Sequence, residues 1–321
     1  MQRFDGKVAV VTGGGTGMGR ELVRQLAAEG CHVAMCDVFE DTMEQSQALA
    51  LEGAPDGTQV TAFVADVSDE SQVLAFRKSV AETISSGHIN LLFNNAGIAG
   101  GGSMVADERE DWDKTFGVCW NGVYFCTRAF LPMLLASKEG HVINTSSVNG
   151  FWASLGPQSA HTAYSAAKFA VKGFTEALIG DFRNNAPHLK ASLVMPGHIG
   201  TSIALNSARA MGREPKEMTS EQLEVARDRM TRMGLPSEGV TDDEIRHGLQ
   251  QMAEQFRDNA PVTAAQAATI ILDGVRKEQW RILIGEDAKV LDRLVREAPE
   301  EAYEAEFMEK LRREADWQLG T

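Results

Sequence analysis

The feature that most constrains the fold of this 321-residue chain is an alternation of short apolar segments with amphipathic ones over its first two-thirds. We expect seven of the apolar segments to be strands: Val8–Thr12, His32–Asp37, Gln59–Asp66, Asn90–Phe93, His141–Thr145, Ala191–Met195 and Arg281–Ile284. Several are apolar on consecutive positions, which is typical of strands covered on both faces. Helical patterns such as Arg20–Glu29 and Trp112–Ala136 lie between them. This alternation predicts an α/β fold with a doubly wound parallel sheet of about seven strands.

A polar segment between the sixth and seventh strands departs from this pattern. We expect residues 202–261 to form a helical lid insertion, with breaks such as Gly234-Leu235-Pro236 between its helices. Capping boxes predict helix starts at three threonines: Thr219 with Gln222, Thr241 with Glu244, and Thr263 with Gln266. The insertion is short and lies between two strands of the same sheet, so we expect 1–321 to be a single domain.

The chain beyond the seventh strand is predicted to be a C-terminal helical extension, residues 286–321. Its two helices are expected at Asp287–Arg296 and Glu300–Arg313. The acidic stretch Glu297–Glu314 is interpreted as the solvated face of these helices.

The composition excludes several classes of partner and site. A net charge of −14 disfavours nucleic acid and anionic membranes, which attract clustered Lys and Arg. No apolar run approaches the ~20 residues needed to span a bilayer. The N-terminus leads directly into a strand, without a cleavable signal. The four cysteines lack the spacing of a disulfide framework or a metal site, so we expect no metal and a reducing, cytoplasmic location.

A glycine-rich turn follows the first strand and precedes a helical pattern. It reads Thr12-Gly13-Gly14-Gly15-Thr16-Gly17-Met18-Gly19. Glycines let the backbone approach a phosphate closely, and the helix N-terminus directs N–H groups toward it. A plain turn is the alternative, but the position between strand and helix favours a dinucleotide site on a Rossmann-type fold.

Asp37 ends the second strand, 18 residues after Gly19. A carboxylate there can accept hydrogen bonds from the adenosine ribose hydroxyls and would repel a 2′-phosphate. No Lys or Arg follows within Val38–Glu40. The pattern therefore predicts NAD in preference to NADP, with a strand-end cap as the alternative role of Asp37.

Further polar residues end the third and fourth strands. Asp66-Val67 follows the third strand, and Asn94-Asn95-Ala96-Gly97 follows the fourth. Ligands of open parallel sheets bind beyond the carboxyl ends of the strands. We therefore expect Gly17, Asp37, Asp66 and Asn95 on one rim.

Tyr164 and Lys168 lie four residues apart in a helical pattern after the fifth strand, which ends in Ser146-Ser147. This spacing places both side chains on one helix face. A phenol with a pKa of about 10 is a poor base at neutral pH, and a nearby ammonium favours the phenolate. Tyr164 can then accept or donate the proton of an alcohol, while a Ser hydroxyl holds the substrate oxygen.

Together these motifs resemble the short-chain dehydrogenases/reductases. The resemblance covers about Asp5 to Ser202, and the glycine spacing is similar to that of the compact branch. It implies that Ser147, Tyr164 and Lys168 are catalytic and that Lys168 also binds the nicotinamide ribose. The cofactor-binding residues that it implies are Gly13, Gly15, Thr16, Gly17, Met18, Gly19, Asp37, Asp66, Val67, Asn95, Ala96, Gly97, Tyr164, Lys168, Pro196, Gly197, Ile199 and Thr201. Among them, Ile199 and Thr201 would face the carboxamide.

Two features depart from the family pattern. The family usually has an Asn three residues before a Gly in the fourth helix, anchoring a water that relays protons to the Lys. Here Cys119 takes that place before Gly122, and Asn121 is turned by about 200° on an α-helix. Asn149, water or Cys119 could serve the relay, or Cys119 is simply a small buried residue. The interval from Ser147 to Tyr164 is 17 residues, longer than usual, and its added segment Phe151–His161 is expected to reshape the pocket wall.

The substrate side is less determined by the sequence. The lid is expected over the nicotinamide, where its methionines either line an apolar pocket or pack the lid on the body: Met211, Met218, Met230, Met233 and Met252. Asn149, Phe151, Trp152 and His198 are candidate substrate contacts, and His198 could equally brace the backbone. Together with Met195, the aromatic pair favours a bulky hydrophobic alcohol or ketone.

The sequence thus predicts an NAD(H)-dependent oxidoreductase that interconverts a secondary alcohol and a ketone, with Tyr164 as acid/base. One alternative is a catalytically silent NAD-binding sensor or scaffold of the same fold. A second is a related dehydratase or epimerase, which the glycine spacing disfavours. By analogy, helices at Trp112–Ala136 and Tyr164–Phe182 are expected to pair subunits in a homodimer or homotetramer.

Overall fold

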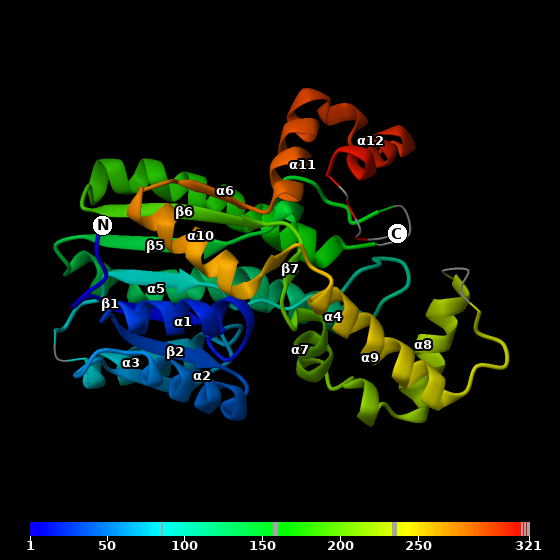
Figure 1. Cartoon of the computed structure of the whole chain (residues 1–321), viewed down its shortest axis with the longest axis horizontal. Helices are drawn as coiled ribbons and strands as arrows, with labels where there is room; N and C mark the ends of the chain where they lie inside the picture. The colour runs from blue at the N-terminus through cyan, green and yellow to red at the C-terminus, as the bar shows by residue number, and fades with distance from the viewer. Residues whose placement is uncertain (85, 157–159, 233–235, 316, 318, 320–321) are drawn as a thin grey trace.

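The computed structural model contains a seven-stranded parallel sheet between two layers of helices (Figure 1). It describes residues 1–84, 86–156, 160–232, 236–315, 317 and 319. The strand order is β3-β2-β1-β4-β5-β6-β9. The strands are β1 (Val8–Thr12), β2 (His32–Asp37), β3 (Val60–Val64), β4 (Leu91–Asn94), β5 (Gly140–Thr145), β6 (Leu189–Pro196) and β9 (Arg281–Ile284). This is the expected Rossmann-type sheet, with β3 shorter and β6 longer than predicted.

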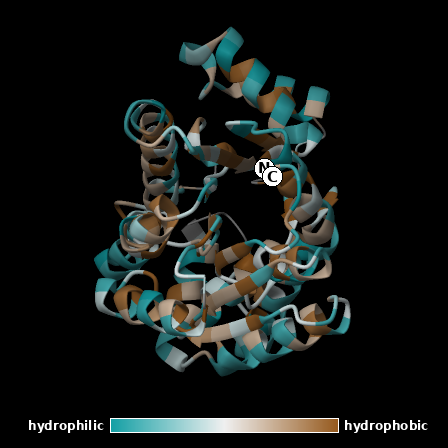
Figure 2. Cartoon of the chain, turned by 90° about the vertical axis from the view of Figure 1, so that its left-hand side faces the viewer, coloured by the Kyte–Doolittle hydropathy of each residue, from teal (hydrophilic) through white to brown (hydrophobic). Residues whose placement is uncertain are grey.

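The two faces of the sheet are covered by different helices. On one face, α1 (Gly17–Ala28), α2 (Glu40–Glu52) and α10 (Ala264–Arg276) pack against residues such as Val11. On the other face, α3 (Glu70–Thr83), α5 (Gly122–Leu135) and α6 (Thr162–Asn185) pack against residues such as Val10. Burial on both faces explains why every residue of β1, β4 and β5 is buried. In Figure 2 the outer helices show mixed hydropathy, as expected of amphipathic helices over a core.

The helix expected over Trp112–Ala136 is interrupted. It comprises α4 (Arg109–Phe116), a π-helical turn over Gly117–Asn121, and α5. A Cβ on Gly122 would lie 2.6 Å from Val67 Cγ2, so the chain passes close to the segment after β3 at this point. The π-turn carries Cys119. The angle of about 200° between Cys119 and Asn121 assumed a regular α-helix. A π-turn has more residues per turn, so this angle does not apply here.

The insertion between β6 and β9 is helical, as predicted. It contains α7 (Ile203–Ala210), α8 (Ser220–Arg232) and α9 (Asp242–Asp258). Two short strands that the sequence did not predict, β7 (Ile199–Gly200) and β8 (Val262–Thr263), pair in parallel at its base. The break Gly234-Leu235 and Met233 lie outside the described residues.

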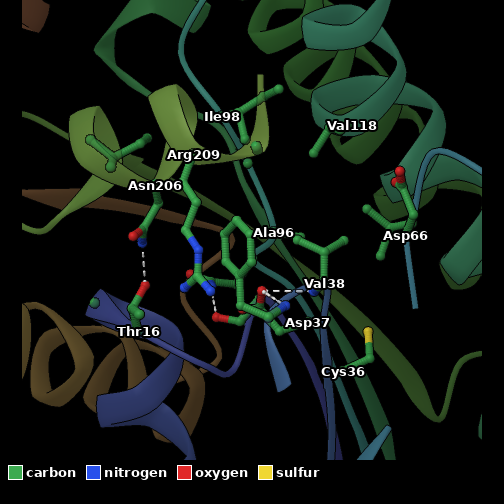
Figure 3. A pocket seen from close by; sticks show the side chains of 18 of the residues that line it. Thr16, Cys36, Asp37, Val38, Asp66, Ala96, Ile98, Val118, Asn206 and Arg209 are labelled. Atoms are coloured by element: carbon green, nitrogen blue, oxygen red, sulfur yellow. Dashed lines mark hydrogen bonds between the residues drawn. The ribbon is translucent and has the colours of Figure 1, made fainter. Parts of the chain in front are cut away.

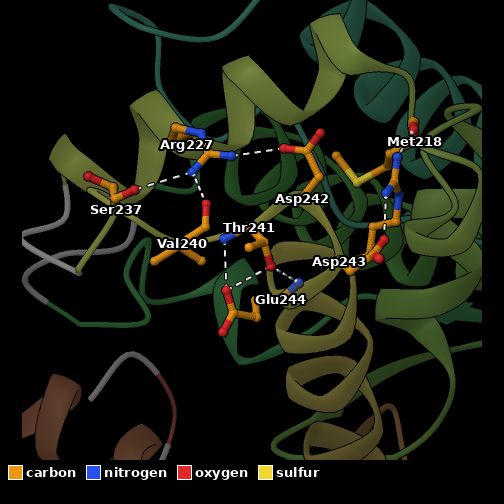
Figure 4. Close-up of polar contacts among 9 residues, drawn as sticks. Met218, Arg227, Ser237, Val240, Thr241, Asp242, Asp243 and Glu244 are labelled. Carbon is orange, nitrogen blue, oxygen red and sulfur yellow. Dashed lines mark hydrogen bonds and ion pairs between the residues drawn. The ribbon is translucent and has the colours of Figure 1, made fainter.

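All three capping boxes form, at Thr219, Thr241 and Thr263. Figure 4 shows how α8 and the start of α9 are joined: Arg227 donates to Asp242 at 2.9 Å and to the carbonyl of Ser237 at 3.2 Å. A small cluster of Met218, Leu223 and Ile245 fills the space between them.

The C-terminal extension forms α11 (Glu286–Glu297) and α12 (Ala305–Ala315). The second helix begins later than the predicted Glu300, because a 3₁₀ turn occupies Pro299–Glu301. Phe307 and Leu311 of α12 are buried while its glutamates are exposed, so the acidic stretch is a solvated face. Across the described ranges, none of the helices combines the length and the apolar character that a membrane crossing requires.

Candidate active site

A pocket of about 320 Å³ opens at the carboxyl ends of β1, β2 and β4 (Figure 3). The predicted cofactor residues that line it are Gly13, Thr16, Gly17, Met18, Asp37, Asp66, Val67, Asn95, Ala96, Gly97 and Thr201. The predicted cofactor residues outside this lining are Gly15, Gly19, Tyr164, Lys168, Pro196, Gly197 and Ile199. The rim expected from the strand ends therefore exists as one cavity.

The turn after β1 requires glycine for two separate reasons. Gly13 and Gly17 have φ of +66° and +54°, in the left-handed region that other residues avoid. Gly19 packs against the turn itself, since a Cβ there would lie 1.9 Å from the carbonyl oxygen of Gly13. Asn95 closes the turn from β4 by donating to the carbonyls of Thr12 at 3.1 Å and Gly13 at 3.3 Å. Gly17 and Met18, at the start of α1, line the pocket.

Asp37 lies at the end of β2, between the glycine turn and the pocket. Its carboxylate accepts from the backbone N–H groups of Gly15 at 3.0 Å, Val38 at 2.8 Å and Phe39 at 3.3 Å. Burial raises the pKa of this carboxyl, and the three N–H donors oppose that rise. The residue therefore caps the strand end, the alternative role, and lines the pocket as well.

Lid helix α7 supplies pocket residues that sequence reasoning did not identify. Asn206 donates to the hydroxyl of Thr16 at 2.6 Å. Arg209 lines the pocket beside Asn206, as Figure 3 shows. Its guanidinium lies 4.0 Å above the ring centroid of Phe39 and pairs with both carboxylate oxygens of Asp41 at 3.2 Å. No local sequence pattern could have found these contacts, because they join segments far apart in the chain.

Ser147, Tyr164 and Lys168 converge beside this pocket. Ser147 is buried at the start of a 3₁₀ turn, where its Oγ accepts from the N–H of Asn149 at 3.1 Å. Tyr164 and Lys168 lie on α6, with Lys168 Nζ 5.3 Å from the Tyr164 ring centroid. Lys168 Nζ donates to the carbonyl of Thr145 at 2.9 Å and would lie 3.6 Å from a Cβ on the pocket residue Gly97.

Burial governs the ionisation of both groups in the protein without ligand. It raises the pKa of Tyr164, a rise that the hydrogen bond with Ser147 opposes. It lowers the pKa of the Lys168 ammonium. The phenol is therefore protonated at neutral pH unless further positive charge is brought near it.

His161 also contacts the candidate acid/base. It immediately precedes α6, and its ring centroid lies 4.7 Å from that of Tyr164. Burial, with a smaller contribution from Arg229 of the lid, lowers the pKa of His161 to about 4. A neutral imidazole therefore packs against the Tyr164 ring, with the two ring planes tilted by 36°.

Cys119 occupies the place where the family pattern has Asn. Its Sγ donates to the carbonyl of Ile98 at 3.2 Å and would lie 3.7 Å from a Cβ on Gly97. Asn149, another candidate for the relay and for substrate contact, uses its amide to donate to the carbonyls of Trp152 at 3.0 Å and Ser154 at 2.8 Å.

None of the four candidate substrate contacts, Asn149, Phe151, Trp152 and His198, lines the pocket. Trp152 is 1% exposed and packs beneath α11 and α12, where its Nε1 donates to the carbonyl of Ala302 at 2.7 Å. His198 braces the backbone, since its Nε2 lies 2.7 Å from the carbonyl oxygen of Phe256 and its N–H donates to Asp287. Phe151 packs between the Trp152 cluster and β6, under the guanidinium of Arg281.

The lid methionines mostly serve the lid itself. Met218 and Met230 belong to the α8–α9 cluster, and Met252 is exposed. Met211 contacts Gly100, where a Cβ would lie 2.3 Å from its terminal carbon. None of these four lines the described pocket. In the part of the chain that the structure describes, no three His, Cys, Asp or Glu side chains are arranged to hold a metal ion.

Comparison with known proteins identifies the family of this chain. The family profile described as short chain dehydrogenase matches residues 7–211. SadH of Mycobacterium tuberculosis, named as an oxidoreductase, is 34% identical over 302 residues, covering 92% of each chain. Meso-2,3-butanediol dehydrogenase of Serratia marcescens is 34% identical over 238 residues, covering 70% of this chain and 89% of that one. A short chain dehydrogenase/reductase from Burkholderia phymatum, solved with NAD, has a TM-score of 0.74 at 28% identity, covering 94% of this chain and 96% of that one. The chain is therefore an oxidoreductase of the short-chain dehydrogenase/reductase family.

Proposed function

We propose that this protein is an NAD(H)-dependent enzyme that interconverts a secondary alcohol and a ketone, with Tyr164 as its acid/base. The observation that carries the proposal is the contact between the two halves of the site. Lys168, one helical turn from Tyr164, reaches Gly97, which lines the groove at the strand ends. The acid/base pair is therefore within reach of a ligand laid along that groove.

A bound nicotinamide dinucleotide would supply the hydride acceptor or donor. Its pyrophosphate would lie against the N–H groups at the start of α1, beside Gly13 and Gly17, which line the pocket with positive φ. Lys168 would hold the nicotinamide ribose, and Ile199 and Thr201 would face the carboxamide. Thr201 lines the pocket and packs close to Gly17, 3.2 Å from a Cβ built there, which supports its contact with the cofactor.

Each catalytic side chain has a distinct part in the proposed reaction. In oxidation, the C–H bond breaks with its electron pair leaving as hydride, and the O–H proton passes to the Tyr164 phenolate. Lys168 favours that phenolate electrostatically. Ser147 donates a hydrogen bond to the substrate oxygen. In the reverse direction Tyr164 returns the proton to the forming alcohol.

The preference for NAD over NADP rests on Asp37. Its carboxylate faces the groove, where it would accept from ribose hydroxyls and repel a 2′-phosphate. The nearby cation Arg209 is paired with Asp41 and therefore partly neutralised. The NAD complex of the Burkholderia phymatum relative is consistent with this preference.

The substrate is proposed to have an apolar body. Ile98 is an apolar residue beside Cys119, near the end of the groove that Lys168 approaches at Gly97. The name levodione reductase, carried by a Leifsonia aquatica relative 35% identical over 225 residues, supports a carbonyl substrate. Unlike Trp152 and His198, Phe151 packs against an apolar cluster that contains Met195, the other residue expected to favour a bulky substrate.

A homodimer or homotetramer is proposed from the outer faces of α5 and α6. Tyr124 on α5 and Phe169 on α6 are 43% and 41% exposed, beside an aromatic cluster with Trp120 and Phe174. Large aromatic side chains of this kind are enriched in subunit interfaces. The four cysteines are buried free thiols, which suits a reducing cytoplasm.

A substrate panel tests the proposal. The full-length protein is offered secondary alcohols with NAD⁺ or NADP⁺, and ketones with NADH or NADPH, and the reduced-nicotinamide absorbance is followed. We expect turnover with NAD(H) and a lower kcat/KM with NADP(H). Tight NADH binding without turnover on any alcohol or ketone would contradict the proposal and favour a silent sensor.

A further inference from the structure

The C-terminal extension, α11 and α12, lies outside residues 7–211 that match the family profile. In Figure 1 it stands at the carboxyl end of the sheet, above the end of β6 and the loop that precedes α6. It makes two sets of contacts there, each to a segment that borders the candidate active site. The lid hairpin α8–α9 lies on another side of the molecule.

The first contact is made by Asp287, in the first turn of α11. Its side chain is buried, and Oδ2 accepts from the backbone N–H of His198 at 2.7 Å. A Cβ on Gly197 would lie 2.2 Å from Oδ2, and a Cβ on Gly285 would lie 2.1 Å from Oδ1. The Asp287 carboxylate thus lies against the backbones of Gly197 and Gly285. Any residue with a Cβ at either position would clash with it.

This contact fixes the segment that leads from β6 into the pocket. Gly197 and His198 connect β6 to β7, and Thr201 follows two residues after β7 begins. On its other side, the His198 ring lies 4.6 Å from the ring of Phe256 on lid helix α9 and its Nε2 meets the Phe256 carbonyl. Asp287 therefore holds the turn between the extension and the lid.

The second contact is made on the segment after Ser147. Trp152 is enclosed by Phe307 and Trp317 at ring-centroid distances of 5.9 Å and 5.7 Å. The N–H of Ala153 donates to the Tyr303 hydroxyl at 3.1 Å, and Trp317 Nε1 donates to the carbonyl of Leu155 at 3.1 Å. The long interval between Ser147 and Tyr164 therefore provides the docking surface of the extension.

Within this segment, Asn149 connects Trp152 to Ser147 through hydrogen bonds. Its amide spans the carbonyls of Trp152 and Ser154, while its N–H donates to Ser147 Oγ. Movement of Trp152 would thus displace the residue that holds the Ser147 hydroxyl.

We propose that the C-terminal extension positions the active site, with Asp287 fixing the turn at His198 and Trp152 fixing the segment that carries Ser147. The two contacts set the distance between the groups that would face the nicotinamide and those that would face the substrate oxygen. This inference rests on the proposed function, because it assigns roles on either side of that site.

The test compares Asp287→Ala with Asp287→Asn, which keeps an acceptor for the His198 N–H, and with Glu286→Ala, an exposed neighbour on α11. Trp152→Phe keeps an aromatic ring in the cluster but fills less space and loses the bond to Ala302. Because small displacements of reacting groups cost large factors in rate, we expect kcat to fall about tenfold or more in Asp287→Ala and Trp152→Phe. Asp287→Asn should keep most of the wild-type kcat, and Glu286→Ala should match the wild type. In all these variants the NADH affinity should change less than about threefold.

Hydrogen–deuterium exchange on the same variants gives a readout that does not require turnover. We expect faster exchange at the amides of 198–201 in Asp287→Ala and at 148–153 in Trp152→Phe, with no change in Glu286→Ala. A lower melting temperature with unchanged kcat and unchanged exchange in both segments would overturn the inference. Absence of turnover in the wild type would instead refute the proposed function, and the exchange result would still decide whether the extension positions these segments.

Discussion

The guanidinium of Arg209 lies 4.0 Å above the ring centroid of Phe39 and forms a two-point ion pair with Asp41. Arg209 belongs to lid helix α7, whereas Phe39 and Asp41 follow β2 on the other side of the pocket. These contacts hold α7 to the segment after β2, across the end of the groove where the adenosine of a dinucleotide is proposed to bind.

Loss of the Arg209 contacts with Phe39 and Asp41 should speed the release of NADH. The ion pair is exposed to solvent, so it and the cation–π contact hold α7 only weakly to the segment after β2. We expect NADH to dissociate about fivefold to tenfold faster from Arg209→Ala, measured by stopped-flow fluorescence, and less so from Asp41→Asn. Arg109→Ala, which breaks an exposed pair on α4, is the control. An unchanged dissociation rate in Arg209→Ala would show that the lid opens without breaking this contact.

Replacement of Asp37 should change the cofactor preference. Asp37→Asn keeps an acceptor for backbone N–H groups but removes the negative charge that would oppose a 2′-phosphate. A charged hydrogen bond is worth about 1.5–3 kcal/mol, so NADH affinity should fall by roughly tenfold or more while NADPH affinity falls less or rises. The ratio of the two dissociation constants is the readout, with Glu40→Gln as the exposed control. A ratio equal to that of the wild type would refute the assignment of Asp37.

Cys119 is expected to act as a small buried residue. Its thiol donates to the Ile98 carbonyl and lies within a tightly packed π-turn. Cys119→Ala should therefore keep kcat within about threefold of the wild type, since an S–H is a weak donor. Cys119→Asn restores the side chain usual in the family and tests whether an amide improves proton relay. A loss of tenfold or more in Cys119→Ala at full cofactor affinity would instead give the thiol a part in the chemistry.

The buried histidines should make the fold sensitive to acid. Burial lowers the pKa of His141 to about 3, and its Nε2 lies 2.7 Å from Ser192 Oγ. Its pKa in the unfolded chain is about 6.5, so the unfolded chain binds this proton more readily than the folded protein. The free energy of unfolding is therefore highest above pH 6.5 and falls as the pH is lowered toward 3. Lowering the pH from 7.5 to 5 should therefore reduce the free energy of unfolding by about 2 kcal/mol through His141. Urea unfolding at the two pH values should show that His141→Gln loses less stability than the wild type. An equal loss in both proteins would refute the prediction.

Much of the sheet could be predicted because both of its faces are buried. Runs such as His32–Asp37 are apolar on consecutive positions for that reason, and β2 has the predicted bounds. The rim of the pocket followed from the same logic, because residues that end parallel strands share one edge. The capping boxes at Thr241 and Thr263 are local as well, each being completed within four residues.

Contacts across long stretches of chain could not be predicted from local patterns. Trp152 reads as a pocket aromatic beside Ser147, yet it meets Ala302, and nothing near Trp152 in sequence indicates that partner. The two-residue strands β7 and β8 are too short to show periodicity. The π-turn depends on the close approach of Gly122 to Val67, which is a tertiary contact.

The central claim is that the Tyr164 hydroxyl transfers the substrate proton with help from Lys168. The most direct test is kcat for oxidation of a secondary alcohol by Tyr164→Phe, beside Tyr124→Phe, which alters an exposed tyrosine on α5. Acid/base catalysis contributes about 10²–10⁴-fold, so Tyr164→Phe should lose at least a hundredfold in kcat while binding NADH normally, and Tyr124→Phe should lose nothing. Tyr164→Phe with kcat within a few fold of the wild type would contradict the account.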